Sequence, residues 1–145
     1  FTAKDIFAID SLSELSNAAF KMVIGSRPTA APPDYGVAQN NLMNFLRLCT
    51  QGMVCSFFMT AHVSREKDEI TGGVKLMTKA IGAALANEIP QLFSDVIYTV
   101  RNGDKFSWDT AAANVDVKTR SLPIRAGLDP DCGRIMAKWV SRKGG

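Results

Sequence analysis

The sequence contains little of what a metal centre, a membrane span or a nucleic-acid-coating surface requires. It has one histidine and three cysteines, and no two cysteines have the C-x-x-C spacing of common zinc sites. No apolar run is long enough to cross a bilayer, and no signal-peptide pattern stands at the start. The formal net charge of +3 is too small to indicate nucleic acid or a membrane surface by itself. Reduced thiols in a cytoplasmic protein are therefore expected.

The sequence does contain enough apolar material for one globular domain. Hydrophobic residues make up 46% of the 145 residues, which is sufficient for one core, and the chain is too short to suggest two domains. A strand is expected almost directly after Phe1, and no initiator methionine precedes it. We therefore expect the chain to be a portion of a longer protein.

The stretch DIFAIDSLSELS, residues 5–16, predicts a buried strand, an acid at its tip and then a helix. The apolar run Ile6–Ile9 ends on Asp10, after which apolar residues recur at helical spacing. Ligands of open α/β sheets bind beyond the carboxyl ends of the strands, so Asp10 is a candidate metal or phosphate-site residue. A purely structural acid is the alternative. Ser11 and Glu14 have the spacing of a capping box, which gives Glu14 a structural explanation.

A second apolar run, MVCSFFMTAH at residues 53–62, predicts another strand. A loop rich in proline and glycine over 25–36 and an amphipathic helix over 37–51 precede it, and the helix is expected to bury Leu42, Phe45, Leu46 and Cys49. Continuous hydrophobicity is typical of a parallel strand covered on both faces. The run ends on His62, which would match Asp10 at the tip of the neighbouring strand, although a lone histidine is more commonly structural.

The rest of the chain predicts a mixed sheet, parallel at its centre and antiparallel at one edge. Residues 64–73 are charged and end in two glycines, which is typical of a solvated loop or hairpin turn. Asn102-Gly103 indicates a two-residue hairpin turn. The other expected elements are strands over 74–77, 95–101 and 115–120, a helix over 80–88 interrupted by Pro90, and a final helix from Asp129-Pro130 that buries Ile135, Met136 and Trp139.

The order of these elements resembles the RecA-like P-loop ATPases encoded by bacteriophages. The resemblance runs from about Asp5 to Pro123, and the segments that carry it are IFAIDSLSEL and FFMTAHVSREKDEITG. It implies an α/β fold, namely a RecA-like three-layer sandwich with a mostly parallel sheet and an antiparallel edge hairpin. Residues 1–145 would form one partial ATPase domain, from the Walker B strand onward. The implied function is ATP-driven work on nucleic acid, DNA above all, in recombination or replication.

The resemblance also implies roles for particular residues. Asp10 would hold Mg²⁺ and its water shell beside the phosphates of ATP, with Ser11 as a second cofactor-binding residue. His62 would contact the γ-phosphate or the attacking water, so His62 and Glu14 are the candidate catalytic residues. The loop after His62 would face nucleic acid, which makes Arg65 and Lys67 candidates for backbone contacts. The family also forms rings or filaments, and the candidate arginine fingers of such a homo-oligomer are Arg101, Arg120 and Arg125.

One departure from the family is serious. The loop G-x-x-x-x-G-K-[ST], which cradles the phosphates, is absent from the sequence. In the family this loop precedes the Walker B strand, so its absence fits a chain that starts partway through the domain. We expect this chain alone to bind nucleotide weakly or not at all and not to hydrolyse ATP. The alternative is a non-catalytic binding or structural module that has lost the phosphate-binding loop. A non-nucleotide enzyme is less favoured, because one histidine without a convincing Ser or Cys partner offers little nucleophilic chemistry.

Overall fold

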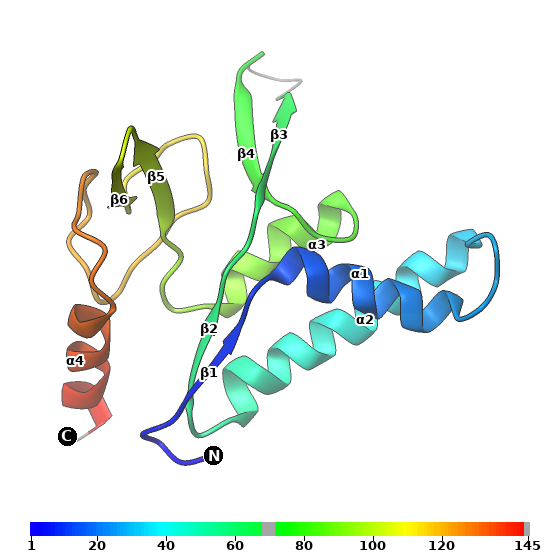
Figure 1. The fold of residues 1–145 in the computed structure, drawn as a ribbon, viewed down its shortest axis with the longest axis horizontal. Coiled ribbons are helices and arrows are strands. Elements are labelled where there is room, and N and C mark those ends of the chain that lie inside the picture. Colours follow the sequence, from blue (N-terminus) through cyan, green and yellow to red (C-terminus); the bar gives the residue numbers. More distant parts are fainter. Residues whose placement is uncertain (68–71, 144–145) are drawn as a thin grey trace. The chain divides into compact units, whose positions relative to one another are not determined.

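The computed structural model describes residues 1–67 and 72–143, apart from the side chains of residues 139, 140, 142 and 143. The chain groups into two compact units. The first unit comprises Phe1–Glu66 and Leu76–Leu92, and the second comprises Lys67–Lys75 and Phe93–Gly145. Figure 1 labels the helices and strands of both units.

Two parallel strands form the sheet of the first unit. β1 (Ile6–Ile9) and β2 (Ser56–Met59) pair along their whole length, with Ile6 opposite Ser56 and Ile9 opposite Met59. The side chains of this pair are less buried than the sequence predicts: Ile6 is 53% exposed, and β2 is half-buried throughout. Because the strands run in the same direction, the residues that follow Ile9 and Met59 emerge at the same end of the pair.

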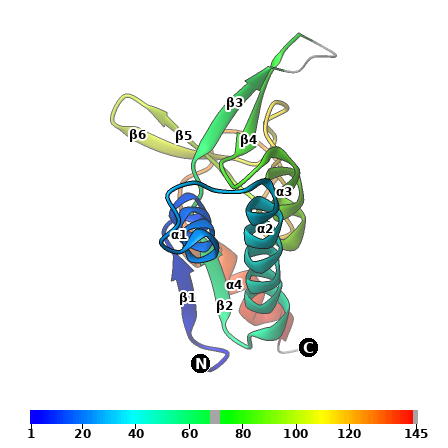
Figure 2. The same ribbon diagram turned by 90° about the vertical axis from the view of Figure 1, so that its right-hand side faces the viewer.

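Helices provide the long connection that two parallel strands require. α1 (Leu12–Ile24) and α2 (Pro32–Arg47) follow β1, and a π-helical turn, η1 (Leu48–Gly52), leads into β2. α1 begins and ends where the apolar spacing predicts. Figure 2 shows α1 and α2 side by side, and the two helices pack against each other.

The buried side of α2 largely follows the expected stripe. Leu42 and Leu46 are buried, and so is Cys49 in η1. Phe45 was expected to join them, but it is 37% exposed. Phe45 is adjacent to Leu46 in the chain, about 100° further round the helix, so the narrow stripe that faces α1 does not include it.

α2 begins five residues before the predicted start, inside the segment that was interpreted as a loop. Pro32 occupies the first helical position, where its missing N–H costs nothing and its φ is already suitable. The carboxylate of Asp34 then accepts a hydrogen bond from the backbone N–H of Ala31 (2.7 Å), and the N–H of Asp34 donates to the carbonyl of Ala31 (3.0 Å). The prolines that indicated a loop therefore start a helix.

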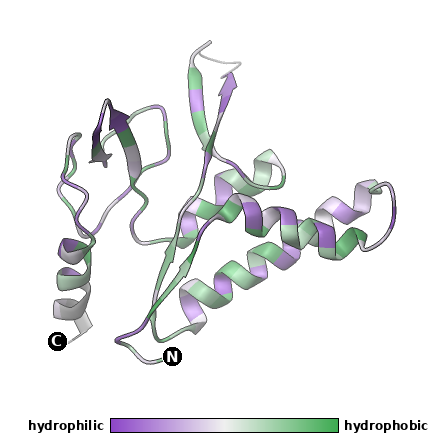
Figure 3. Ribbon diagram, in the orientation of Figure 1, coloured by the Kyte–Doolittle hydropathy of each residue, from purple (hydrophilic) through white to green (hydrophobic). Residues whose placement is uncertain are grey.

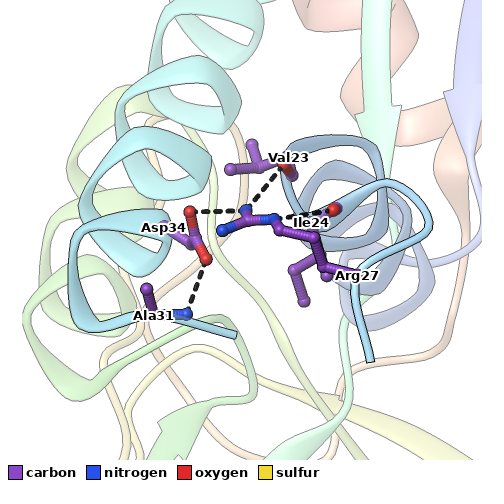
Figure 4. A network of polar contacts seen from close by, with 5 residues as sticks. All are labelled: Val23, Ile24, Arg27, Ala31 and Asp34. Atoms are coloured by element: carbon purple, nitrogen blue, oxygen red, sulfur yellow. Dashed lines mark hydrogen bonds and ion pairs between the residues drawn. The ribbon is translucent and has the colours of Figure 1, made fainter. Parts of the chain in front are cut away.

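Arg27 ties the end of α1 to the start of α2, as Figure 4 shows. Its guanidinium donates to Asp34 Oδ1 (2.8 Å) and to the carbonyls of Val23 (3.2 Å) and Ile24 (3.1 Å). The hydrogen bond from Arg27 is the main reason why the pKa of Asp34 lies below its usual value. The connection between the two helices is seven residues long, and the hydrogen bonds of Arg27 hold its two ends together.

Two more strands and a short helix complete the first half of the chain. β3 (Val63–Lys67) and β4 (Val74–Thr78) form a two-stranded sheet, and α3 (Ala83–Glu88) follows. Pro90 was expected to interrupt this helix, and from there the chain continues as a 3₁₀ turn, η2 (Ile89–Leu92). Residues 64–73 were expected to form a solvated loop or a hairpin turn. The first of them, up to Lys67, belong to β3, and residues 68–71 lie outside the described part of the chain.

The second unit contains a hairpin and a helix. β5 (Tyr98–Asn102) and β6 (Lys105–Asp109) are antiparallel, with Asn102 opposite Lys105. The hairpin is confirmed, but its two turn residues are Gly103 and Asp104, one position later than predicted. Gly103 has a φ of +62°, as a primed turn with glycine at its first central position requires.

The C-terminal helix of the second unit is α4 (Cys132–Lys143). Ile135 is buried and Met136 half-buried, as expected, whereas the side chain of Trp139 lies outside the described part of the structure. In place of the edge strand expected over 115–120, the structure has isolated bridges at Val115 and Lys118, and Lys118 pairs with Val96.

Polar side chains hold the irregular part of this unit. Asp95 accepts hydrogen bonds from Thr119 Oγ1 (2.7 Å), from the N–H groups of Arg120 (2.9 Å) and Ser121 (3.1 Å), and from the hydroxyls of Ser94 and Ser121 (3.2 Å each). Burial opposes the ionisation of Asp95, but these hydrogen bonds outweigh it and lower the pKa of the carboxyl.

The expected RecA-like three-layer sandwich with a mostly parallel sheet is wrong. Within residues 1–67 and 72–143 the strands form three two-stranded sheets, β1–β2, β3–β4 and β5–β6, and β1–β2 alone is parallel. The continuous apolar run that suggested a strand covered on both faces instead forms half of an isolated parallel pair. No helix in the described part of the chain has the length and apolar content needed to cross a membrane.

Candidate functional site

Asp10 lies directly after β1, at the end of the parallel pair where ligands of open α/β sheets bind. Its carboxylate accepts a hydrogen bond from the hydroxyl of Thr60, the first residue after β2. The backbone continues the pairing, since Thr60 N–H donates to the carbonyl of Ile9 (3.0 Å). A carboxylate therefore stands on a rigid strand end, and its side chain is exposed.

The capping box expected at the start of α1 does not form. Ser11 is buried and makes no side-chain capping hydrogen bond. The backbone N–H of Leu12 donates instead to the carbonyl of Thr60 (2.9 Å), and that of Leu15 to the carbonyl of Ser11 (3.0 Å). A distant acceptor at the end of β2 replaces the local cap, which sequence spacing cannot reveal. Glu14 thus loses the structural explanation that the spacing gave it.

A pocket of about 240 Å³ lies beside the first turns of α1. Three segments of the first unit surround it: the start of α1, His62, and the three residues that follow β4. The lining residues are Ser13, Glu14, Ser16, Asn17, His62, Lys79, Ala80 and Ile81. Ser13 Oγ donates to the carbonyl of Lys79 (3.1 Å), and Lys79 N–H donates to the carbonyl of His62 (2.8 Å). These two hydrogen bonds fasten the three segments together.

The pocket brings together the two residues that the resemblance implied to be catalytic. Glu14 and His62 both line it, although they are 48 positions apart in the chain. Asp10 and Ser11, the expected cofactor-binding residues, are not among its lining residues. His62 also lies beyond the strand tip at which it was expected, because β2 ends at Met59. The structure therefore provides two neighbouring features, the Asp10–Thr60 strand end and the pocket.

Six of the eight lining residues were not predicted from the sequence, among them Lys79 and Ser16. Lys79 follows β4 without any motif around it, and it enters the pocket because its backbone is bonded to Ser13 and His62. Ser16 lies one helical turn after Leu12 and is 2% exposed. Its hydroxyl is the one fully buried side-chain polar atom without a hydrogen-bond partner in the described part of the chain. No sequence pattern signals either residue.

The described residues contain no cluster of three or more His, Cys, Asp or Glu side chains that could hold a metal ion. Asp10 would therefore be a single protein ligand. That fits Mg²⁺, which proteins bind through one or two carboxylates while phosphates and water complete the shell. Asp10 offers no resident metal site of its own, and a cation there would need the oxygens of a bound phosphate.

The expected nucleic-acid residues lie on β3. Arg65 and Lys67 are both exposed, and Figure 3 shows the end of this strand as hydrophilic. The arginine-finger candidates all belong to the second unit and are exposed. Arg101 donates to the carbonyl of Gly103 (2.9 Å) and lies 5.7 Å from the centre of the Phe106 ring, so the hairpin occupies its guanidinium.

Arg120 and Arg125 serve the fold through their backbones. The N–H of Arg120 donates to Asp95, and Arg125 exchanges backbone hydrogen bonds with the side chain of Thr110.

Comparison of the chain with protein-family models, curated proteins and solved structures found no match.

Proposed function

We propose that this chain is the C-terminal portion of a nucleotide-binding ATPase that acts on nucleic acid, DNA above all, in phage recombination or replication. The observation that carries the proposal is the carboxylate of Asp10 at the shared end of two parallel strands, bonded to Thr60 on the neighbouring strand. Such a carboxylate holds the water shell of Mg²⁺ when phosphate oxygens supply the other ligands. His62 follows two residues after Thr60, within the segment that a γ-phosphate would face.

The proposal does not require the larger parallel sheet that the structure excludes. It requires a glycine-rich phosphate loop from outside these 145 residues, since the sequence has none. The active form would be a homo-oligomer in the cytoplasm of a bacterial host, in which an arginine from a neighbouring copy completes the site. Support for these parts of the proposal comes from the segments around Asp10 and His62 that resemble phage ATPases.

The decisive test is a titration of the isotopically labelled chain with Mg²⁺-ATP, followed by NMR. Because one carboxylate and no phosphate loop are present, we expect a dissociation constant on the order of 1 mM. The shifted resonances should centre on Asp10, Thr60 and His62, and they should disappear without Mg²⁺ or in Asp10→Asn. The matched control is Asp104→Asn, which removes an exposed carboxylate in the β5–β6 turn.

Two results would overturn parts of the proposal. A concentration of about 10 mM Mg²⁺-ATP is roughly ten times the expected dissociation constant. If it shifts no resonance, the nucleotide site does not exist. A micromolar affinity would contradict the inference that the phosphate-binding element is missing.

The nucleic-acid part is tested by the salt dependence of DNA binding. Each phosphate contact contributes about 0.7 to 0.9 to the slope of log K against log salt. Replacing both Arg65 and Lys67 by alanine should therefore reduce the slope by about 1.5 on a labelled oligonucleotide. The double variant Lys4→Ala, Lys21→Ala removes the same charge from exposed positions and should leave the slope unchanged. Equal slopes for the two double variants would refute a contact through β3.

The second candidate function is a non-catalytic binding module. The observation that favours it is the pocket beside α1, which does not include Asp10 among its lining residues. A chain that binds a small molecule there and ignores Mg²⁺-ATP would belong to this class.

A further inference from the structure

We propose that the pocket beside α1 binds a small zwitterion, of which a free α-amino acid is the simplest form. This inference goes beyond the proposed ATPase and rests on Ser16, Glu14 and Lys79. Glu14 and His62 are shared with the candidate catalytic residues of the ATPase, whereas Ser16 and Lys79 are not. It rests on the hydroxyl of Ser16, on the charges around the pocket and on the size of the pocket.

The Ser16 hydroxyl is the first observation. Ser16 is 2% exposed, it lines the pocket, and its Oγ has no hydrogen-bond partner among the described residues. Buried polar groups in folded proteins are nearly always paired, so an unpaired one needs a specific explanation. Ser16 is among the residues that line the pocket, so a ligand oxygen there would pair with this hydroxyl once a small movement of the side chain uncovers Oγ.

The charges are the second observation. Glu14 and Lys79 line the same pocket, yet they form no ion pair within 4.0 Å. Neither side chain makes a hydrogen bond or ion pair with any other described residue, so both charges remain available. A simple anion in the pocket would be attracted to Lys79 and repelled by Glu14. A simple cation would be attracted to Glu14 and repelled by Lys79. A ligand with a carboxylate and an ammonium group satisfies both.

The remaining lining residues suit the same ligand. His62 and Asn17 each offer a ring or amide group that can donate or accept a hydrogen bond at the exposed rim. The volume of about 240 Å³ lies below the range of 300–1,000 Å³ found for drug-sized ligands, and it equals about eight water molecules at ~30 Å³ each. A whole nucleotide is too large for this pocket, whereas an amino acid fits.

The experiment titrates the labelled chain with individual α-amino acids, beginning with glycine, and follows the resonances of residues 13–17 and 79–81. Acetate, ammonium and inorganic phosphate at the same ionic strength are the single-charge probes. At least one α-amino acid should bind saturably and about tenfold more tightly than each of these probes, because it makes one more charge-assisted hydrogen bond. If phosphate binds more tightly than every amino acid, or if no amino acid exceeds acetate, the proposal is refuted.

Variants identify the groups responsible. Glu14→Gln and Lys79→Met should each weaken binding about tenfold, since each removes one charged partner. The matched controls are Glu88→Gln and Lys21→Met, which change exposed charges in the same unit and should leave the affinity unchanged. Equal effects of the test and control variants would overturn the assignment. All four side chains are exposed, so the variants should fold.

Ser16→Ala separates a binding role from a structural one. If the hydroxyl serves the ligand, its removal weakens binding at least threefold and does not lower the unfolding midpoint of the free protein, because an unpaired buried group is lost. A lower midpoint with unchanged binding would show that the hydroxyl serves the fold and would refute its part in the site. Asp10→Asn should leave amino-acid binding intact, and Lys79→Met should leave the Mg²⁺-ATP shifts at Asp10 intact, so the two proposals can fail separately.

Discussion

Removal of the Asp95 carboxylate should destabilise the second unit strongly, because this side chain is the anchor of residues 119–121. Oδ1 accepts three hydrogen bonds, from Thr119 Oγ1 and the N–H groups of Arg120 and Ser121, and Oδ2 accepts two from hydroxyls. Hydrogen bonds to a charged group contribute about 1.5–3 kcal/mol each when buried. Because Asp95 is only half-buried, we include only its two hydrogen bonds with Ser121, which is 1% exposed. Each of these is assigned about 1.5 kcal/mol, the low end of the range, and the other three hydrogen bonds are neglected. The expected cost of Asp95→Ala is then about 3 kcal/mol.

Asp95→Asn is the matched variant. The amide oxygen of asparagine can take the place of Oδ1. The amide NH₂ group takes the place of Oδ2 and can donate to the hydroxyls of Ser94 and Ser121, because a hydroxyl can rotate and accept a hydrogen bond. Only the charge is lost, and the expected cost is about 1 kcal/mol. Urea unfolding followed by tryptophan fluorescence measures both variants selectively, because both tryptophans, Trp108 and Trp139, belong to the second unit.

The pH dependence gives an independent check on Asp95. The pKa of Asp95 is lowered in the folded protein, so its charge stabilises the fold above the unfolded pKa, near 3.8, and this contribution disappears as the pH falls through the folded value. The stability gap between the wild type and Asp95→Asn should therefore close at acidic pH. A gap that persists below the folded pKa, or an Asp95→Ala variant as stable as the wild type at pH 7, would refute this reasoning.

Three further predictions concern the same two units. Leu46→Ala should cost about 3 kcal/mol in the first unit, since Leu46 is fully buried, and circular dichroism rather than tryptophan fluorescence should detect the loss. Thr110→Val should cost about 2 kcal/mol, because the buried hydroxyl donates to the carbonyl of Pro123 (2.7 Å) and accepts from Arg125 N–H, whereas Thr110→Ser should be close to the wild type by urea unfolding. Gly103→Ala should cost about 1 kcal/mol through its φ of +62° alone, since a Cβ there meets no neighbour, and an unchanged urea midpoint would contradict the turn geometry.

Local patterns predicted the elements of this chain better than their assembly. The apolar spacing after Asp10 defined α1, and Asn-Gly located the hairpin to within one residue, because both signals depend on neighbours in sequence. The start of α2 was missed because Pro32 and Pro33 were interpreted as loop residues, although proline suits the first turn of a helix. The sheet was wrong because hydrophobicity over residues 53–62 indicates burial but does not specify how many strands provide it.

Only the site residues that lie next to the end of a strand or the start of a helix could be predicted from the sequence. The sequence shows that the apolar run ends at Ile9 and that the next residue is an acid, so it places Asp10 at the end of β1. Lys79 could not be predicted, because its place depends on two backbone hydrogen bonds to Ser13 and His62, far away in the chain. The capping box failed for the same reason, since the carbonyl of Thr60 is a tertiary partner for the start of α1.

Natural sequences satisfy local rules almost everywhere, and they break them mainly where function requires it. Ser16 breaks one such rule in the described part of the first unit, because its buried hydroxyl has no partner, and two opposite charges that do not pair lie beside it. Glu14 and His62, which were selected from the sequence for a different reason, line this same pocket. The pocket therefore contains both residues that the resemblance implied to be catalytic, together with the unpaired hydroxyl of Ser16. The residues around it are the first that should be changed, because their replacement tests a binding function without disturbing the core at Leu42 and Leu46.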